Sequence, residues 1–182
     1  ADICATPLML ALTLVDGVLC DTVPVTDRGL LYGDGVFETL AYRQYQLVQL
    51  PAHLQRLQAS CEQLGIPVER HDIEQQIDRL LSCLPTGPDA PRDGVIKIVV
   101  TRGDGGRGYA PPVSPNARCL MQFHPMPADY AGFSRSGISS MRCRHPVSTN
   151  RALAGLKHLN RLDQVMASRE LVVAQNRAGH GY

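Results

Sequence analysis

A single lysine in the C-terminal third of the sequence is placed where it could act as a nucleophile. Lys157 follows Gly155, which suits a tight turn, and precedes Leu159, Leu162 and Met166, which recur at the spacing of an amphipathic helix. A lysine at the start of such a helix can be partly desolvated, and desolvation favours the neutral amine. A neutral amine forms Schiff bases with carbonyl compounds. Most lysines are solvated surface charges, so this interpretation depends on the rest of the chain.

The composition is that of an ordinary globular protein. The chain has 182 residues, 44% of them apolar, and a formal net charge of +1, which predicts one or two domains and no nucleic-acid or membrane partner. Its six cysteines are scattered, so we expect no metal site and reduced thiols in a cytoplasmic protein. The apolar run at 8–14 is too short to span a bilayer and has no basic segment before it, so no signal peptide is expected.

The hydrophobic pattern predicts an α+β protein with an antiparallel sheet and two helices. Expected strands are 10–15 and 18–23 around the Asp16-Gly17 turn, then 36–42, 47–50, 95–101 and 118–123. On strand 36–42, Phe37, Thr39 and Ala41 should share one face, with Glu38 and Leu40 on the other. One helix should begin at Pro51 and end at Gly65, and a second should follow an N-cap at Asp72.

Proline and glycine clusters suggest the domain boundaries. Residues 85–93 should form a loop, and the two prolines around Met126 predict a linker over 124–131 between an N-terminal domain, 1–123, and a second domain, 132–182. We expect residues 136–143 to form the first strand of the second domain. The helix after Lys157 should run to about residue 172.

One glycine-rich segment imitates a dinucleotide-binding motif. Residues 103–108 match G-x-G-x-x-G, but that pattern binds a pyrophosphate only where a helix begins at once. Here Pro111, Pro112 and Pro115 follow, so a helix cannot persist. Two interpretations remain open, a plain hairpin loop or a flexible loop that carries Arg107 and Tyr109 to an anionic substrate.

Four stretches of the chain, in the right order, carry a family resemblance. They are 27–29 with 32–39, 53–57, 101–109 and 154–162. Together they resemble the aminodeoxychorismate lyase family of fold-type-IV pyridoxal phosphate (PLP) enzymes. The first two stretches are shared across fold type IV, and the last two look closer to the lyases than to the aminotransferases. The resemblance covers roughly residues 14–172.

The resemblance implies roles for several residues. Lys157 matches the lysine that holds PLP and then moves protons, and Arg56 matches the arginine that contacts the cofactor phosphate, a role suited to a permanently charged planar group. Thr39 matches a hydroxyl close to the bound cofactor. Arg107, Tyr109 and Arg28 are candidates to meet substrate carboxylates, and surface charge is the alternative for each arginine.

Other polar residues are expected to give support rather than chemistry. Asn160 and Arg161 should fix the geometry around the lysine. Asp34 and Glu38 could be read as a catalytic carboxylate pair, but we expect them to shape the loop and the strand, because nothing else in the sequence suggests glycosidase-like chemistry.

The implied function is a PLP-dependent lyase of folate biosynthesis. It would convert 4-amino-4-deoxychorismate, a dicarboxylate, to 4-aminobenzoate and pyruvate, in a cytoplasmic homodimer with a two-domain fold. A D-amino-acid or branched-chain aminotransferase of the same fold is an alternative.

The family continues past the lysine helix, and this departure opens a further alternative. Its later part completes the PLP domain and supplies a glutamate for the pyridine nitrogen; Glu170 cannot be assumed to replace it. The second domain is therefore expected to be incomplete. The chain is then either a shortened lyase or a non-catalytic remnant that binds no cofactor.

Overall fold

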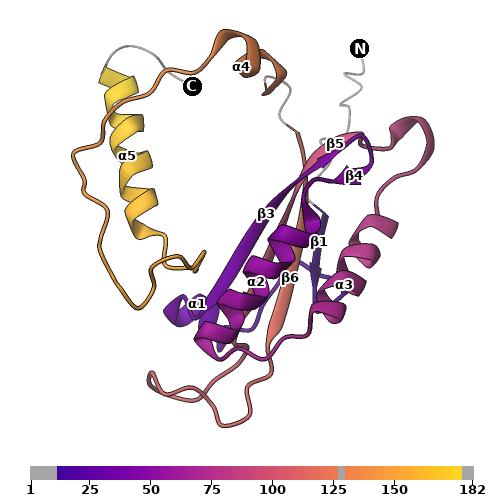
Figure 1. The fold of residues 1–182 in the computed structure, drawn as a ribbon, viewed down its shortest axis with the longest axis vertical. Coiled ribbons are helices and arrows are strands. Elements are labelled where there is room, and N and C mark those ends of the chain that lie inside the picture. The colour runs from indigo at the N-terminus through magenta and orange to yellow at the C-terminus, as the bar shows by residue number, and fades with distance from the viewer. Residues whose placement is uncertain (1–11, 127–129, 178–182) are drawn as a thin grey trace, which may run out of the picture. The chain divides into compact units, whose positions relative to one another are not determined.

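The computed structural model describes residues 12–126 and 130–177, which fall into two compact units. The first unit contains the described residues up to Met126 together with Lys157–Leu159. The second contains the other described residues, from Tyr130 onward. Figure 1 shows the elements of both units in chain order. None of the helices in these ranges is long and apolar enough to cross a lipid bilayer.

The first unit is built on a six-stranded antiparallel sheet with the strand order β2-β1-β6-β5-β3-β4. The strands are β1 (Leu12–Val15), β2 (Val18–Leu19), β3 (Gly35–Arg43), β4 (Gln46–Leu47), β5 (Asp93–Thr101) and β6 (Arg118–Pro125). Asp16 and Gly17 both have positive φ, as a two-residue hairpin turn of type I′ requires. The predicted hairpin is therefore confirmed, with shorter strands; the start of its first predicted strand lies outside the described residues.

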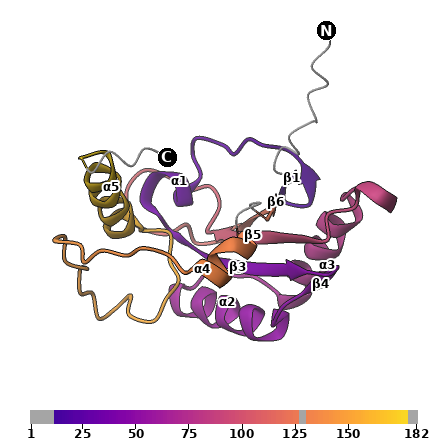
Figure 2. The ribbon, with the colours of Figure 1, turned by 90° about the horizontal axis from the view of Figure 1, so that it is seen from above.

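Two helices cover one face of this sheet. They are α2 (Leu50–Leu64), which packs on β3, and α3 (Arg70–Ser82), which packs on β6 and β1; Figure 2 shows α2 running alongside β3. As predicted, Pro51 lies in the first turn of α2 and Gly65 ends it in the left-handed conformation. The predicted N-cap of α3 was wrong. Glu69 holds that position and Asp72 lies in the first turn, where its charge still complements the helix dipole.

The hydrophobic core lies between the sheet and these helices. Val36, Leu40 and Tyr42 of β3 face it and are buried, whereas Phe37 and Thr39 lie on the other face, as the alternation in the sequence predicts. Glu38 is the exception in the core-facing row, because it is charged and only 1% exposed. The residues that complete the core are Leu14, Leu54, Leu57, Cys61, Ile66, Ile73, Ile77, Leu80, Leu84, Ile96, Ile98, Val100, Cys119, Met121 and Phe123.

The remaining helical elements of the first unit are short. A five-residue helix, α1 (Arg28–Tyr32), lies within the predicted loop that precedes β3, and a 3₁₀ turn, η1 (Gly87–Asp89), lies within the predicted loop at 85–93. Residue 124 and Pro125 belong to β6, and residues 127–129 of the predicted linker lie outside the described residues.

The second unit contains two helices, α4 (Tyr130–Ser136) and α5 (Leu162–Arg177). The strand predicted at 136–143 was wrong, because α4 includes Ser136 and the chain turns at Gly137 with a φ of +74°. The residues after it are irregular and mostly exposed. The helix after the lysine begins only at Leu162, so Lys157 precedes it by more than one turn.

The two faces of β3 should respond differently to truncation. Leu40→Ala removes a fully buried side chain and should lower the free energy of unfolding by about 2–5 kcal/mol. Thr39→Ala, at the next position but on the exposed face, should lower it by less than about 1 kcal/mol. Urea unfolding of both variants measures the difference, and equal losses would contradict the assigned faces.

Candidate active site

Lys157 reaches the first unit by pairing with the edge of β3. Among the described residues, β4 pairs with only the last two residues of β3, Tyr42 and Arg43. At the other end of β3, the Phe37 N–H donates to the Lys157 carbonyl at 2.9 Å, and the Leu159 N–H donates to the Gly35 carbonyl at 2.9 Å. Val36 and His158 thereby form an antiparallel bridge. The segment 157–159 therefore extends the sheet by a few residues and fixes the lysine backbone.

Gly35 makes this edge pairing possible. A Cβ atom at this position would lie 2.5 Å from the Val100 carbonyl oxygen and 2.8 Å from Cδ1 of Leu159. Both distances are shorter than real carbon contacts allow, so any side chain here would push the 157–159 segment or β5 away. The glycine that opens the strand thus lets the lysine segment approach β3 closely.

The amino group of Lys157 lies between an aromatic ring and a buried carboxylate. Its Nζ is 3.7 Å from Oε2 of Glu38 and 4.8 Å from the ring centroid of Phe37, and the side chain is 29% exposed. Lys97, on β5, holds its own Nζ 5.9 Å from the centroid of the same ring. The amine is thus partly shielded from water, next to one negative charge.

Glu38 collects three cationic or hydrogen-bonding groups. Arg56 donates from Nε to Oε1 at 2.6 Å and from Nη2 to Oε2 at 2.7 Å, while Nδ1 of His53 lies 2.8 Å from Oε2. Burial alone raises the pKa of the Glu38 carboxyl, but the hydrogen bonds from Arg56 and His53 and the charges of Arg56 and Lys157 outweigh it and lower that pKa. Glu38 therefore stays ionised although it faces the core.

Helix α2 supplies the two groups that clamp Glu38. His53 and Arg56 are three residues apart, so they project from the same side of the helix. The guanidinium is about half exposed, and its bonds to Glu38 use Nε and Nη2 but not Nη1. The hydrogen bonds that Arg56 donates to Glu38 raise the pKa of Arg56 further. A cation held in this way at the surface suits an anion such as a phosphate.

A second carboxylate, which is partly buried, holds the neighbouring loops together. Asp34 accepts from Nε of Arg28 at 2.8 Å and from Nε of Arg102 at 2.8 Å. Arg102 also donates to the carbonyls of Leu64 and Gly65 at the end of α2, both at 2.7 Å. Burial raises the pKa of Asp34, but the hydrogen bonds from Arg102 and Arg28 outweigh it and hold that pKa below its ordinary value. This network ties the loop before β3 to the helix that carries Arg56.

Arg28 has a structural place in the glycine-rich loop. It is 3% exposed. Besides Asp34, its guanidinium donates to the carbonyls of Gly108, Tyr109 and Ala110 at 2.8–3.2 Å, and a Cβ on Gly105 would overlap its side chain. These bonds engage the guanidinium in folding the glycine-rich loop, and the predicted contact of Arg28 with a substrate stays a prediction.

The glycine-rich segment is a hairpin loop between β5 and β6, which pair antiparallel up to Thr101 and Arg118. No helix follows its G-x-G-x-x-G pattern among the described residues. Gly103 has a φ of +79°, and a Cβ there would overlap the Asn116 carbonyl oxygen, so this glycine serves the fold of the loop. Arg107 is exposed and Tyr109 is 84% exposed. Both remain available to a ligand.

Thr39 lies on the face of β3 opposite Glu38, across from Lys97 on β5. It is exposed. Thr39 therefore does not share a face of β3 with Glu38. Its predicted place beside a cofactor remains a prediction.

The acidic residues of α5 have local partners within the second unit. Glu170 accepts hydrogen bonds from the backbone N–H groups of Arg144 and His145 at 2.9–3.2 Å. Asp163 accepts from the N–H and hydroxyl of Ser148 at 2.9 Å and 3.0 Å. Both carboxylates fasten the segment before the lysine to the helix.

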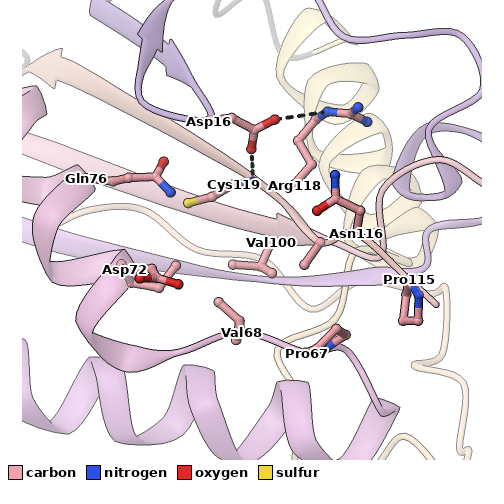
Figure 3. Close-up of a pocket in the computed structure, with 12 residues that line it drawn as sticks. Asp16, Pro67, Val68, Asp72, Gln76, Val100, Pro115, Asn116, Arg118 and Cys119 are labelled. Carbon is pink, nitrogen blue, oxygen red and sulfur yellow. Dashed lines mark hydrogen bonds and ion pairs between the residues drawn. The ribbon is translucent and has the colours of Figure 1, made fainter.

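A cavity of about 310 Å³ lies elsewhere in the first unit, between α3 and the start of β6. Figure 3 shows Gln76 of α3 and Cys119 of β6 among its lining residues, with Asp16 bonded to the Cys119 N–H. Burial raises the pKa of the Cys119 thiol well above its ordinary value, so the thiol is a poor nucleophile. The residues that line this cavity do not include Lys157, Glu38, Arg56 or His53.

Comparison with known proteins identifies the family. The family described as amino-transferase class IV matches residues 35–177, which is most of the chain, so the chain belongs to this family.

Individual relatives point the same way. The chain is 33% identical to an aminodeoxychorismate lyase of Vibrio harveyi over 157 residues, 86% of this chain and 56% of that relative. It is 34% identical to a putative branched-chain-amino-acid aminotransferase of Methanocaldococcus jannaschii, over 76% of this chain and 47% of that one. The crystal structure of 4-amino-4-deoxychorismate lyase from Pseudomonas aeruginosa matches 87% of this chain and 56% of its own, with 43% identity and a TM-score of 0.76. The chain thus spans about half the length of these relatives.

Neutralising Asp34 should loosen the loops in a pH-dependent way. Asp34→Asn should lower the free energy of unfolding at pH 7 by about 3 kcal/mol, because it leaves two largely buried arginines without their counter-charge. The pKa of Asp34 is depressed in the folded state, so its contribution is present above about pH 4 and is lost as the pH falls through the folded-state pKa. Urea unfolding at several pH values should therefore show the two proteins converging in acid.

Glu74→Gln, which breaks an exposed pair with Arg70, is the matched control and should cost less than about 0.5 kcal/mol. A deficit in Asp34→Asn that stays constant from pH 7 to pH 3 would contradict the assignment.

Gly35→Ala should detach the lysine segment from β3. The added Cβ has no room against Val100 and Leu159, so the amide hydrogens of Phe37 and Leu159 should exchange with solvent at least about tenfold faster. Gly106→Ala is the control, since a Cβ there meets nothing within 4 Å. Hydrogen exchange read by NMR checks this; unchanged protection at both amides would refute the tight approach.

Proposed function

We propose that this protein is a PLP-dependent lyase that converts 4-amino-4-deoxychorismate to 4-aminobenzoate and pyruvate. The observation that carries the proposal is the pairing of Lys157 and Arg56 with one buried carboxylate, Glu38. A lysine amine and a guanidinium are the groups that a cofactor with an aldehyde and a phosphate needs. Here they come from distant parts of the chain to one place.

The residues present fit PLP. Lys157 would hold the aldehyde carbon of the cofactor, and Arg56 would contact its phosphate with Nη1, the guanidinium nitrogen that does not bond to Glu38. Both side chains are partly exposed. When bound, PLP supplies an electron sink for negative charge that develops at the substrate Cα. Folate biosynthesis, a cytoplasmic location and a homodimer follow from the family resemblance and stay predictions.

The chain's own groups would move protons and hold the substrate. The amine of Lys157 would take the proton from the substrate Cα, in a position shielded on one side by the ring of Phe37. Arg107 and Tyr109, exposed on the loop between β5 and β6, would meet the carboxylates of the substrate. Thr39 would add a hydroxyl on the open face of β3. Loss of the proton and departure of the enolpyruvyl group as pyruvate make the six-membered ring aromatic, which favours the forward reaction.

An aminotransferase of the same family is the main alternative. The 34% identity to the Methanocaldococcus jannaschii protein supports it, whereas the 43% identity to the Pseudomonas aeruginosa lyase favours the lyase. The two activities differ in the amino acceptor, because a lyase releases pyruvate without one.

Reductive trapping tests the cofactor site in the chain itself. After incubation with PLP and borohydride, peptide mass spectrometry should find the pyridoxyl adduct on Lys157, and Lys157→Arg should abolish it. Lys97→Arg is the control, because Lys97 lies near the same aromatic ring but not near Glu38. A folded chain that gives no adduct on Lys157 would support the alternative of a non-catalytic remnant.

Pyruvate release separates the two enzyme classes. With 4-amino-4-deoxychorismate as the only substrate, a lactate-dehydrogenase-coupled assay should detect pyruvate, and Arg56→Gln should reduce the rate at limiting PLP by about tenfold through loss of the phosphate contact. Amino transfer from D-alanine or a branched-chain amino acid to 2-oxoglutarate, without pyruvate from the chorismate derivative, would favour the aminotransferase.

A further inference from the structure

We infer that Glu38 is a positioning residue that holds Lys157 and Arg56 in their working arrangement. The inference deepens the proposed function and rests on it for the meaning of the arrangement. Neither the sequence pattern nor the family resemblance assigns Glu38 a role beyond shaping the strand.

The position of Glu38 in the strand is costly for a charged group. Its neighbours in the same row of β3, Val36 and Leu40, are completely buried apolar residues. An ionised carboxylate there loses its hydration and is tolerated only when other groups replace that hydration. The replacement comes from His53 and Arg56 on α2 and from Lys157, whose segment pairs with the edge of β3.

The two carboxylate oxygens of Glu38 have different partners. Oε1 accepts the Nε bond of Arg56 at 2.6 Å. Oε2 is shared by Nη2 of Arg56, Nδ1 of His53 and the more distant Nζ of Lys157. The bidentate contact fixes the plane of the guanidinium, and the shared oxygen sets the lysine amine relative to that plane.

The same carboxylate also offsets repulsion between like charges. Lys157 and Arg56 are both cationic groups drawn to one place, and Glu38 is the negative group between them. Lys97, whose Nζ lies 5.9 Å from the centroid of the Phe37 ring, adds positive charge nearby. Without Glu38, the two working side chains should separate while the apolar core around them remains packed.

Glu38→Gln tests this because glutamine keeps the size of the side chain and removes its charge. Half-saturation of Lys157 trapping by PLP should need about tenfold more PLP in the variant. Trapping by pyridoxal, which lacks the phosphate, should change by less than about threefold, because Arg56 has no phosphate to contact in that ligand. In an Arg56→Gln background, Glu38→Gln should have little further effect on the ratio of PLP to pyridoxal, since the two residues act as one unit.

A second readout does not need the cofactor. The Overhauser effect between the Hε protons of Lys157 and the ring protons of Phe37 should weaken at least about twofold in Glu38→Gln, because the carboxylate that holds the amine near the ring is gone. The other groups of this site are Arg56 and His53, which contact Glu38, and Lys97, whose Nζ lies 5.9 Å from the centroid of the same ring. Glu74→Gln is the control for loss of a carboxylate and should leave this signal unchanged.

The outcomes separate the two proposals. No PLP adduct on Lys157 in the wild type, with a weakened Lys157–Phe37 signal in Glu38→Gln, would refute the cofactor function and keep the positioning role. An unchanged signal, or an equal loss of PLP and pyridoxal trapping in a folded Glu38→Gln variant, would overturn the positioning role whatever the cofactor result. Circular dichroism in the near ultraviolet checks that the variant is folded.

Discussion

The candidate site depends on the edge pairing between residues 157–159 and the start of β3. Two backbone hydrogen bonds, from Phe37 to Lys157 and from Leu159 to Gly35, bring a segment from far along the chain to the sheet. A strand edge offers unpaired N–H and C=O groups, and a short segment can satisfy them without becoming a full strand. The close contact needs glycine at position 35. Once this pairing forms, the lysine amine lies within reach of Glu38.

Two carboxylates, Glu38, which is buried, and Asp34, which is partly buried, then connect the elements of the site. Glu38 joins β3, α2 and the lysine segment, and Asp34 joins the loop before β3, the loop after β5 and the end of α2. In each carboxylate, arginine contacts outweigh the effect of burial, and the pKa lies below its ordinary value for that reason. Helix α2 belongs to both networks, so the helix that carries His53 and Arg56 is held at its first turns by Glu38 and at its last residues by Arg102.

Local features could be predicted from the sequence, and long-range partners could not. The Asp16-Gly17 turn, the limits of α2 and the alternation along β3 follow from neighbouring residues. The lysine and Arg56 were found through the family resemblance. Glu38 was assigned to strand shaping, because its partners become visible only when α2 and the lysine segment fold against β3. The bonds of Arg28 to the carbonyls of the glycine-rich loop could not be predicted, because they form only when that loop folds around the guanidinium. The strand predicted at 136–143 rests on a few apolar residues alone, and this segment has no strand partner among the described residues.

The most direct test of this account is an NMR measurement of the Val36–His158 bridge. Residues facing each other between two such hydrogen bonds bring their Hα atoms close, so a strong Hα–Hα Overhauser effect between Val36 and His158 is expected. The established sheet pair Phe37 and Val99 supplies the reference signal. A signal of comparable strength would place Lys157 beside Glu38 in solution. Its absence, with the reference signal present, would mean that the lysine segment does not pair with β3 and that the site is not assembled as described.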